Sequence, residues 1–238
     1  MKASEQYVQG NLAYCENVQV EAGEGVILSR IVNQVKKRYV YLFLKRFFDV
    51  TFSLAAMIIL LPLFFMTAVA IKLDSKGPFL YSQLRSGKNG KPFRMYKFRS
   101  MCVDADERLK TLQCLNEKDG PVFKMTNDPR VTRVGRVIRK TSVDELPQLI
   151  NIIKGDMSIV GPRPPLLNEV EQYTAYQMQR LSITQGLTCY WQISGRSDMS
   201  FDEWVWLDLK YIEESGVWTD FKTILKTVPA VVFGWGAY

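Results

Sequence analysis

Two adjacent carboxylates, Asp144 and Glu145, have the clearest capacity for chemistry in this sequence. They stand in the run Ser142-Val-Asp-Glu-Leu-Pro-Gln-Leu149. Because Pro147 lacks a backbone N–H and is tolerated in the first turn of a helix, a helix is predicted to begin near Asp144. Unpaired N–H groups and the helix dipole at that end keep a carboxylate ionised and can also receive a phosphate. The pair is therefore a candidate for chemistry on a phosphate group.

A purely structural interpretation of the same run stays open. In that interpretation Asp144 is the N-cap, and Ser142-x-x-Glu145 is a capping box. The apolar positions 146, 149, 150 and 153 then form the buried stripe of the helix. Taken alone, the local pattern favours the cap over a catalytic acid.

Cations lie on both sides of the acid pair. Lys97 and Arg99 alternate along a predicted strand, so their side chains share one face, where they either hold a phosphate or form a solvated edge. Arg163 stands between prolines in Gly161-Pro-Arg-Pro164. The prolines restrict its backbone, so Arg163 loses little entropy when it binds an oxyanion.

A row of arginines leads into the acid pair. Asp128-Pro-Arg130 is typical of a turn, and arginines then recur at positions 130, 133, 136 and 139. This spacing places them along one side of a helix-like segment. Arg139, at its end, shortly precedes Asp144.

The composition excludes several kinds of chemistry. The chain of 238 residues has 31 Lys and Arg against 24 Asp and Glu, and it has no histidine. Histidine-based catalysis and the usual zinc ligands are therefore excluded. Residues 36–108 hold 14 basic and five acidic side chains, which indicates an anionic partner. The four cysteines are scattered without a Cys-x-x-Cys pair, which favours a reducing, cytosolic setting.

One segment is long and apolar enough for a membrane. Residues 50–71 are 22 residues without a charge, with Pro62 near the middle and basic residues at both flanks. Because the positive-inside rule gives a single span one basic side, two basic flanks favour a helix that bends at Pro62 and returns. A plain span stays the alternative. The N-terminal residues carry no secretory signal, so export is not expected.

Other local signals predict a mixed α/β fold (α+β mixed). The Ser86-Gly-Lys-Asn-Gly90 turn predicts a β-hairpin, and further strands are predicted at 157–160 and 187–193. Helices are predicted at 166–181, after the Ser200-x-x-Glu203 capping box, and from Asp220. The expected domains are an N-terminal extension with a surface-lying helix (1–43), a re-entrant membrane helix (44–73) and a small cytosolic catalytic domain with membrane-associated helices (74–238).

Six motifs in order resemble the bacterial sugar transferase family, the monotopic phosphoglycosyl transferases that act on polyprenyl phosphate. They are Lys97-Phe-Arg-Ser-Met101, Asp128-Pro-Arg130, Ser142-Val-Asp-Glu-Leu-Pro-Gln-Leu149, Gly155-Asp-Met-Ser158, Gly161-Pro-Arg-Pro164 and Trp191-Gln-Ile-Ser-Gly-Arg196. Pro62 also matches the helix-breaking proline of the family. Each motif alone is weak, but their shared order and spacing over about residues 44–238 are specific.

The resemblance implies an enzyme on the cytoplasmic face of the bacterial inner membrane, in contact with its lipid. It would move a sugar-1-phosphate from a UDP-sugar to undecaprenyl phosphate, release UMP and so begin the assembly of an exopolysaccharide, capsule or O-antigen. Asp144 would correspond to the nucleophile that forms a covalent phosphosugar intermediate. Glu145 would correspond to the acid that helps to hold Mg²⁺, which prefers one or two carboxylates together with phosphate oxygens. The oligomeric state, including a homodimer, stays open.

The resemblance also implies roles for the polar residues around the acids. The phosphate-binding residues would be Lys97, Arg99, Arg130, Arg139 and Arg163, and the nucleotide would contact Gln192 and Arg196. One departure weakens the last two assignments: this chain has Gln185-Gly-Leu-Thr-Cys-Tyr190 where family members usually have Pro-Gly-Ile/Leu-Thr-Gly.

Two rival functions are considered. The first is a membrane-tethered protein without catalysis, whose basic half binds anionic lipid or a nucleotide. The second is a nucleic-acid binder, which the uncharged segment and the lack of interleaved basic and aromatic residues disfavour. No nucleic acid is therefore expected as a partner.

Overall fold

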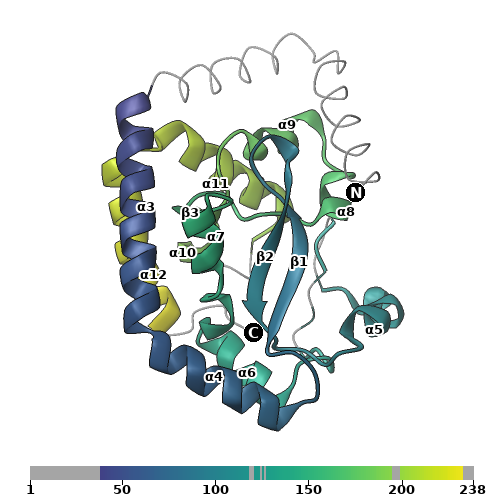
Figure 1. The fold of residues 1–238 in the computed structure, drawn as a ribbon. Coiled ribbons are helices and arrows are strands. Elements are labelled where there is room, and N and C mark those ends of the chain that lie inside the picture. The colour runs from purple at the N-terminus through teal and green to yellow at the C-terminus, as the bar shows by residue number, and fades with distance from the viewer. Residues whose placement is uncertain (1–37, 118–120, 124, 126, 195–198, 233–238) are drawn as a thin grey trace.

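A bent pair of helices forms one side of the molecule in this computed structural model, which describes residues 38–117, 121–123, 125, 127–194 and 199–232. Helices α3 (Tyr39–Ile59) and α4 (Leu61–Asp74) meet at an angle of 62° (Figure 1). Pro62 lies in the first turn of α4, where its missing N–H ends the hydrogen-bond ladder of α3. The predicted break at Pro62 is thus confirmed.

The bent pair has the length and apolar character of a membrane segment only when its two arms are taken together. No single helix in the described part of the chain meets that test alone. Helix α3 begins at Tyr39, so it runs across the expected boundary between residues 43 and 44. The predicted extension up to residue 37 lies outside the described residues.

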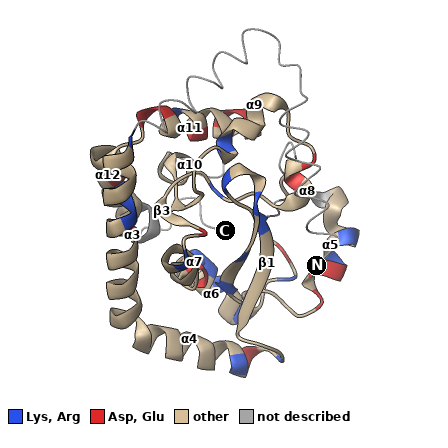
Figure 2. Cartoon of the chain, turned by 45° about the horizontal axis from the view of Figure 1, so that its top comes forward, with Lys and Arg blue, Asp and Glu red and all other residues tan. Residues whose placement is uncertain are grey.

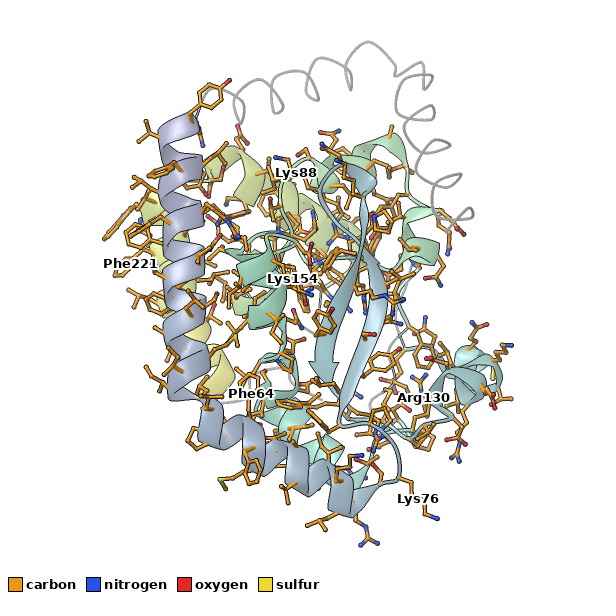
Figure 3. All side chains as sticks on the ribbon, viewed as in Figure 1. Phe64, Lys76, Lys88, Arg130, Lys154 and Phe221 are labelled. Atoms are coloured by element: carbon orange, nitrogen blue, oxygen red, sulfur yellow. The ribbon has the colours of Figure 1, made fainter. Side chains whose placement is uncertain are left out.

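The outer faces of the bent pair and of helix α12 (Val217–Val232) are exposed and apolar. Figure 2 shows the lower part of α3 and most of α4 without charged residues, and Figure 3 shows Phe221 of α12 on the outer side beside α3. Large apolar side chains exposed there are Phe43, Phe47, Phe52, Ile58, Phe65, Leu73, Trp218, Phe221 and Leu225. An exposed apolar surface of this kind is suited to lipid.

An antiparallel hairpin forms the middle of the domain. Strands β1 (Leu80–Ser86) and β2 (Pro92–Phe98) pair around a short 3₁₀ turn, η1 (Lys88–Gly90). Asn89 adopts φ = +56° in this turn, a conformation that asparagine tolerates. The predicted hairpin is confirmed. Helix α5 (Ala105–Leu112) and the 3₁₀ turn η2 (Gln113–Leu115) follow on its far side (Figure 1).

A second, parallel pair of short strands lies between the hairpin and α3. Strands β3 (Ser158–Val160) and β4 (Gly186–Thr188) approach so closely that a Cβ on Gly186 would lie 2.1 Å from the nitrogen of Gly161. Gln185, which replaces the usual proline, is buried and donates from Nε2 to the carbonyls of Arg180 and Ile183. In this chain the turn before β4 is therefore held by hydrogen bonds from the Gln185 side chain, where family members usually have a rigid proline.

Short helices connect these strands and complete the core. Along the chain they are α6 (Arg133–Lys140), η3 (Val143–Glu145), α7 (Gln148–Lys154), α8 (Leu167–Val170), α9 (Ala175–Met178), η4 (Gln179–Leu181), α10 (Tyr190–Ile193) and α11 (Phe201–Glu214). The mixed α/β class is confirmed, with helices predominating. The capping box at Ser200 and Glu203 is also confirmed.

Two predicted elements are wrong. The predicted polar helix over 166–181 is three short helical turns, and it buries Val170 and Leu181 in the core. The predicted strand over 187–193 ends at Thr188, because the Gln192 side chain accepts from the backbone of Cys189 and starts helix α10. The predicted final helix is confirmed as α12, which begins at Val217, before Asp220, and continues through Pro229.

Buried polar contacts attach α3 to the domain. Asp49 of α3 accepts hydrogen bonds from the Ser158 hydroxyl at 2.7 Å and from the backbone N–H of Ile159 at 3.1 Å. Lys45 forms an ion pair with Asp220 of α12 at 2.8 Å. Helix α3 of the bent pair is thus bonded to both β3 and α12.

We expect Asp49→Ala to lower the free energy of unfolding by about 2–4 kcal/mol, because two buried donors lose their acceptor. Denaturation in mild detergent, followed by tryptophan fluorescence, measures this change. Thr51→Ala is the matched control, since the Thr51 hydroxyl is exposed on the same helix and bonds only to that helix. Equal stability of the Asp49 and Thr51 variants would contradict the anchoring role.

Candidate active site

The acid pair lies in a 3₁₀ turn and not at the start of a regular helix. In η3 the N–H of Glu145 bonds to the carbonyl of Ser142, whose φ is +56° and whose side chain makes no capping bond. Pro147 has no N–H to continue this ladder, so α7 begins only at Gln148. The prediction that Asp144 is an N-cap within a capping box is therefore wrong.

Asp144 is a buried carboxyl group surrounded by charges. Its residue is 8% exposed. Burial raises the pKa of Asp144 to about 6, Glu145 raises it as well, and Lys97 and Arg139 oppose the rise. Asp144 is thus mostly ionised at neutral pH, as predicted, but nearby cations hold the charge in place of a helix terminus. A poorly solvated carboxylate of this kind is well suited to act as a nucleophile.

Glu145 is held by a lysine from the hairpin. Lys97 Nζ of β2 lies 2.8 Å from Glu145 Oε1, and both side chains are partly exposed. Among the described residues no three acidic, cysteine or histidine side chains gather as a ready metal site. The residues present therefore fit Mg²⁺ only in combination with phosphate oxygens, which is the ligand set that Mg²⁺ favours.

Arg99 is not brought to the same place as Lys97. Strand β2 ends at Phe98, and Arg99 turns toward the end of α4, where its Nη2 donates to the carbonyl and hydroxyl of Ser75 at 2.8 Å. Its Nε and Nη1 are buried without a hydrogen-bond partner. The predicted convergence of Lys97 and Arg99 on one spot is wrong, because the strand alternation does not extend to residue 99.

The arginine row divides among three surroundings. Arg130 forms a buried ion pair with Asp128 and lies on the α5 side of the hairpin (Figure 3). The arginines at 133 and 136 are exposed on α6. Arg139 is half-buried at the end of α6, where its charge acts on both Asp128 and Asp144. Only Arg139 of the row therefore faces the acid pair.

The remaining predicted residues lie on other elements. Arg163 stacks its guanidinium over the ring of Trp204, 5.2 Å from the ring centre. Gln192 uses its Oε1 to cap α10 through the N–H of Cys189. Arg196 lies outside the described residues.

Two residues with evident roles at this site were not predicted. Asn151 of α7 bonds to the backbone of Tyr96 and Arg94, which docks the helix after the acid pair onto β2. Arg85 of β1 is buried and lies near Arg163. In the hairpin register Arg85 pairs with Phe93 and Tyr81 pairs with Lys97, so Arg85 and Lys97 share one face of the hairpin.

The arrangement can bind a phosphate and attack it. It combines a desolvated carboxylate, a second acid that fits a metal together with phosphate, and cations from the hairpin and α6. It lies beside an apolar bent helix pair, so a substrate of amphipathic character can reach it.

Comparisons with known proteins show the family of this chain. The family described as "Bacterial sugar transferase" matches residues 40–234. "Galactosyl transferase CpsE" of Streptococcus agalactiae is 47% identical over 84% of this chain and 44% of its own length. "Undecaprenyl-phosphate galactose phosphotransferase" of Salmonella typhimurium is 44% identical over 90% of this chain and 45% of its own length.

A shorter relative is matched over most of both chains. "Exopolysaccharide production protein ExoY" of Rhizobium meliloti is 41% identical over 82% of this chain and 88% of its own length. The chain thus spans less than half the length of the two relatives named first and most of the third. With the family matching 40–234, the chain belongs to the bacterial sugar transferase family.

Proposed function

We propose that this chain transfers a sugar-1-phosphate from a UDP-sugar to undecaprenyl phosphate and releases UMP. The observation that carries the proposal is Asp144, a buried carboxylate held among Lys97, Arg139 and Glu145 in a member of this family. The names of relatives support a sugar phosphate donor and an undecaprenyl phosphate acceptor. The product would begin the assembly of an exopolysaccharide, a capsule or an O-antigen.

The reaction proceeds in two displacements at phosphorus. An oxygen of Asp144 attacks the phosphorus that bears the sugar, and the bond from this phosphorus to the bridging oxygen breaks. The electron pair of that bond leaves with UMP, and an aspartyl-phosphosugar intermediate forms. A phosphate oxygen of undecaprenyl phosphate then attacks the same phosphorus and frees the Asp144 carboxylate.

The surrounding residues orient the phosphates and hold charge. Lys97 keeps Glu145 in place, and both lie next to the attacking carboxylate. Glu145 together with the donor phosphates would hold Mg²⁺, whose charge stabilises the negative charge that builds up on the phosphates. Arg139 offers a further cation from the other side of Asp144.

The bent helix pair supports a re-entrant attachment to the cytoplasmic face of the inner membrane. Both its ends are basic, and its outer faces are apolar. The phosphate of the lipid acceptor lies at the membrane surface. A re-entrant helix would keep the rest of the chain at that same surface. Asp144 lies shortly before α7, which packs on α3, and this packing would hold the nucleophile near that surface.

A screen of UMP release across UDP-glucose, UDP-galactose and UDP-N-acetylglucosamine, with undecaprenyl phosphate and Mg²⁺, tests the activity. We expect Asp144→Asn to reduce UMP release at least about a thousandfold, because the amide cannot attack phosphorus. Asp202→Asn is the matched control, since Asp202 is exposed on α11. If the wild type releases no UMP from any donor, a lipid-binding protein without catalysis becomes the better account.

The pH dependence follows from the raised pKa of Asp144. The carboxylate is the form that attacks, so protonation as the pH falls through about 6 removes the nucleophile. We expect single-turnover UMP release to fall about tenfold per pH unit in the acidic range. A rate that stays constant from neutral pH to well below this pKa, while the fold remains intact by fluorescence, would contradict the assigned role.

The re-entrant topology predicts that both ends of the bent pair are cytoplasmic. In a cysteine-free background, Tyr39→Cys and Lys76→Cys should resist a membrane-impermeant maleimide in intact cells, and permeabilised cells should label both. Lys88→Cys in the hairpin turn serves as the cytoplasmic reference. Labelling of residue 39 alone from outside would show a plain span.

A further inference from the structure

Arg85 is a buried cation with unused hydrogen-bonding capacity. The residue is 6% exposed at the end of β1. Its Nη1 donates to the carbonyl of Pro164 at 3.2 Å, and its Nη2 donates to Gln83 Oε1 at 3.0 Å. The Nε–H is buried and has no partner. A buried donor left unpaired costs free energy, and a ligand that accepts from it recovers that cost.

Arg85 is held directly beside the segment that carries Arg163. The N–H of Ser86 bonds to the carbonyl of Pro165 at 2.9 Å, and Arg85 forms an antiparallel bridge with Leu166. The residues after Arg163 therefore run along the free edge of β1. This pairing fixes the backbone of the segment from which the Arg163 side chain extends.

The hairpin register places Arg85 on the face that meets the acid pair. Arg85 lies opposite Phe93 and Tyr81 opposite Lys97, and paired residues of an antiparallel ladder share a face. Lys97 on that face bonds to Glu145. Arg85 is thus on the same side of the hairpin as the group that attacks, and Arg94 is on the other side.

The charges around Arg85 favour an added anion. Burial and then the charge of Arg163 lower the pKa of Arg85 to about 10, while Glu169 and Glu145 oppose the change. Arg85 remains protonated at neutral pH. Glu145 is already paired with Lys97, and Glu169 accepts from the backbone of Leu166. Because both glutamates already have partners, the two arginines are suited to bind a phosphate, which can accept hydrogen bonds from both guanidinium groups.

We infer that Arg85, together with Arg163, binds the phosphate that leaves with uridine. The inference rests on the proposed function and assigns a part of it to a residue outside the family motifs quoted above. When the bond from the sugar-bearing phosphorus to the bridging oxygen breaks, its electron pair adds a negative charge to the departing UMP. Lys97 bonds to Glu145 beside the attacking carboxylate, whereas Arg85 bonds to the carbonyl of Pro164, next to Arg163 in the chain. An arginine pair on the departing phosphate stabilises that added charge.

The test compares the binding of UMP and uridine to the full-length protein in detergent by calorimetry. The wild type should bind UMP more tightly than uridine. Arg85→Gln should weaken UMP binding about 10- to 100-fold, the effect of losing charge-assisted bonds to phosphate, and leave uridine binding unchanged. Arg94→Gln, on the exposed opposite face of the same hairpin, should bind both as the wild type does.

Arg85→Lys covers the case in which the glutamine variant does not fold. Lysine keeps the charge and loses the planar fork, so UMP binding should weaken about 3- to 10-fold. If UMP binding to both folded variants, or to the folded one, stays within about twofold of the wild type, Arg85 only tethers Pro164 and the inference is wrong. Equal affinity of the wild type for UMP and uridine would also overturn it.

The outcome separates this inference from the proposed function. A wild type that turns over a UDP-sugar, with Arg85 variants that bind UMP normally, would refute the role of Arg85 and keep the transferase. A wild type that releases no UMP from any donor, yet binds UMP through Arg85, would refute the transferase and keep the phosphate site.

Discussion

The attachment of α3 to the domain is the contact on which the rest of the site depends. Asp49 bonds to Ser158 and Ile159 at β3, and Arg46 donates to the carbonyls of Ile152 and Ile153 at the end of α7. Buried polar groups on an otherwise apolar helix are costly unless they are paired, so these bonds fix one register between α3 and the domain. Because the acid pair lies just before α7, the same bonds fix its position relative to α3. A loosely attached α3 would leave the acid pair without a defined position beside the bent helix pair.

Burial and charge have opposite effects on Asp144, and the balance suits a nucleophile. Burial strips water from the carboxylate and raises its pKa to about 6, while Lys97 and Arg139 limit the rise. The group is thus ionised at neutral pH but weakly solvated. The 3₁₀ turn matters here, because the oxygens of a carboxylate at a regular helix N-cap would accept hydrogen bonds from backbone N–H groups. In the proposed reaction, the departure from the expected cap means that Asp144 does not hold a helix N-terminus.

The sequence predicted the structural features that depend on residues adjacent in the chain. It did not predict the features that depend on residues far apart in the chain. The helix break at Pro62, the hairpin turn and the Ser200 cap each follow from a few adjacent residues, and all are confirmed. Helix α10 was taken for a strand because its start depends on the Gln192 side chain, and the β4 strand beside it pairs with a segment far away in sequence. The acid pair stands out in the sequence, but the burial and the raised pKa of Asp144 come from tertiary packing. Arg85 was missed because its neighbours Arg163 and Glu145 are brought to it only by the fold.

The central claim is that Asp144 becomes covalently attached to a phosphosugar. Mass spectrometry of the protein after incubation with a UDP-sugar that it turns over, with Mg²⁺ and without lipid acceptor, tests this claim most directly. The account predicts one phosphosugar group on the peptide that contains Asp144, removed when undecaprenyl phosphate is added. UMP release that proceeds with acceptor while no peptide ever carries the group, or a group carried on another residue, would contradict it.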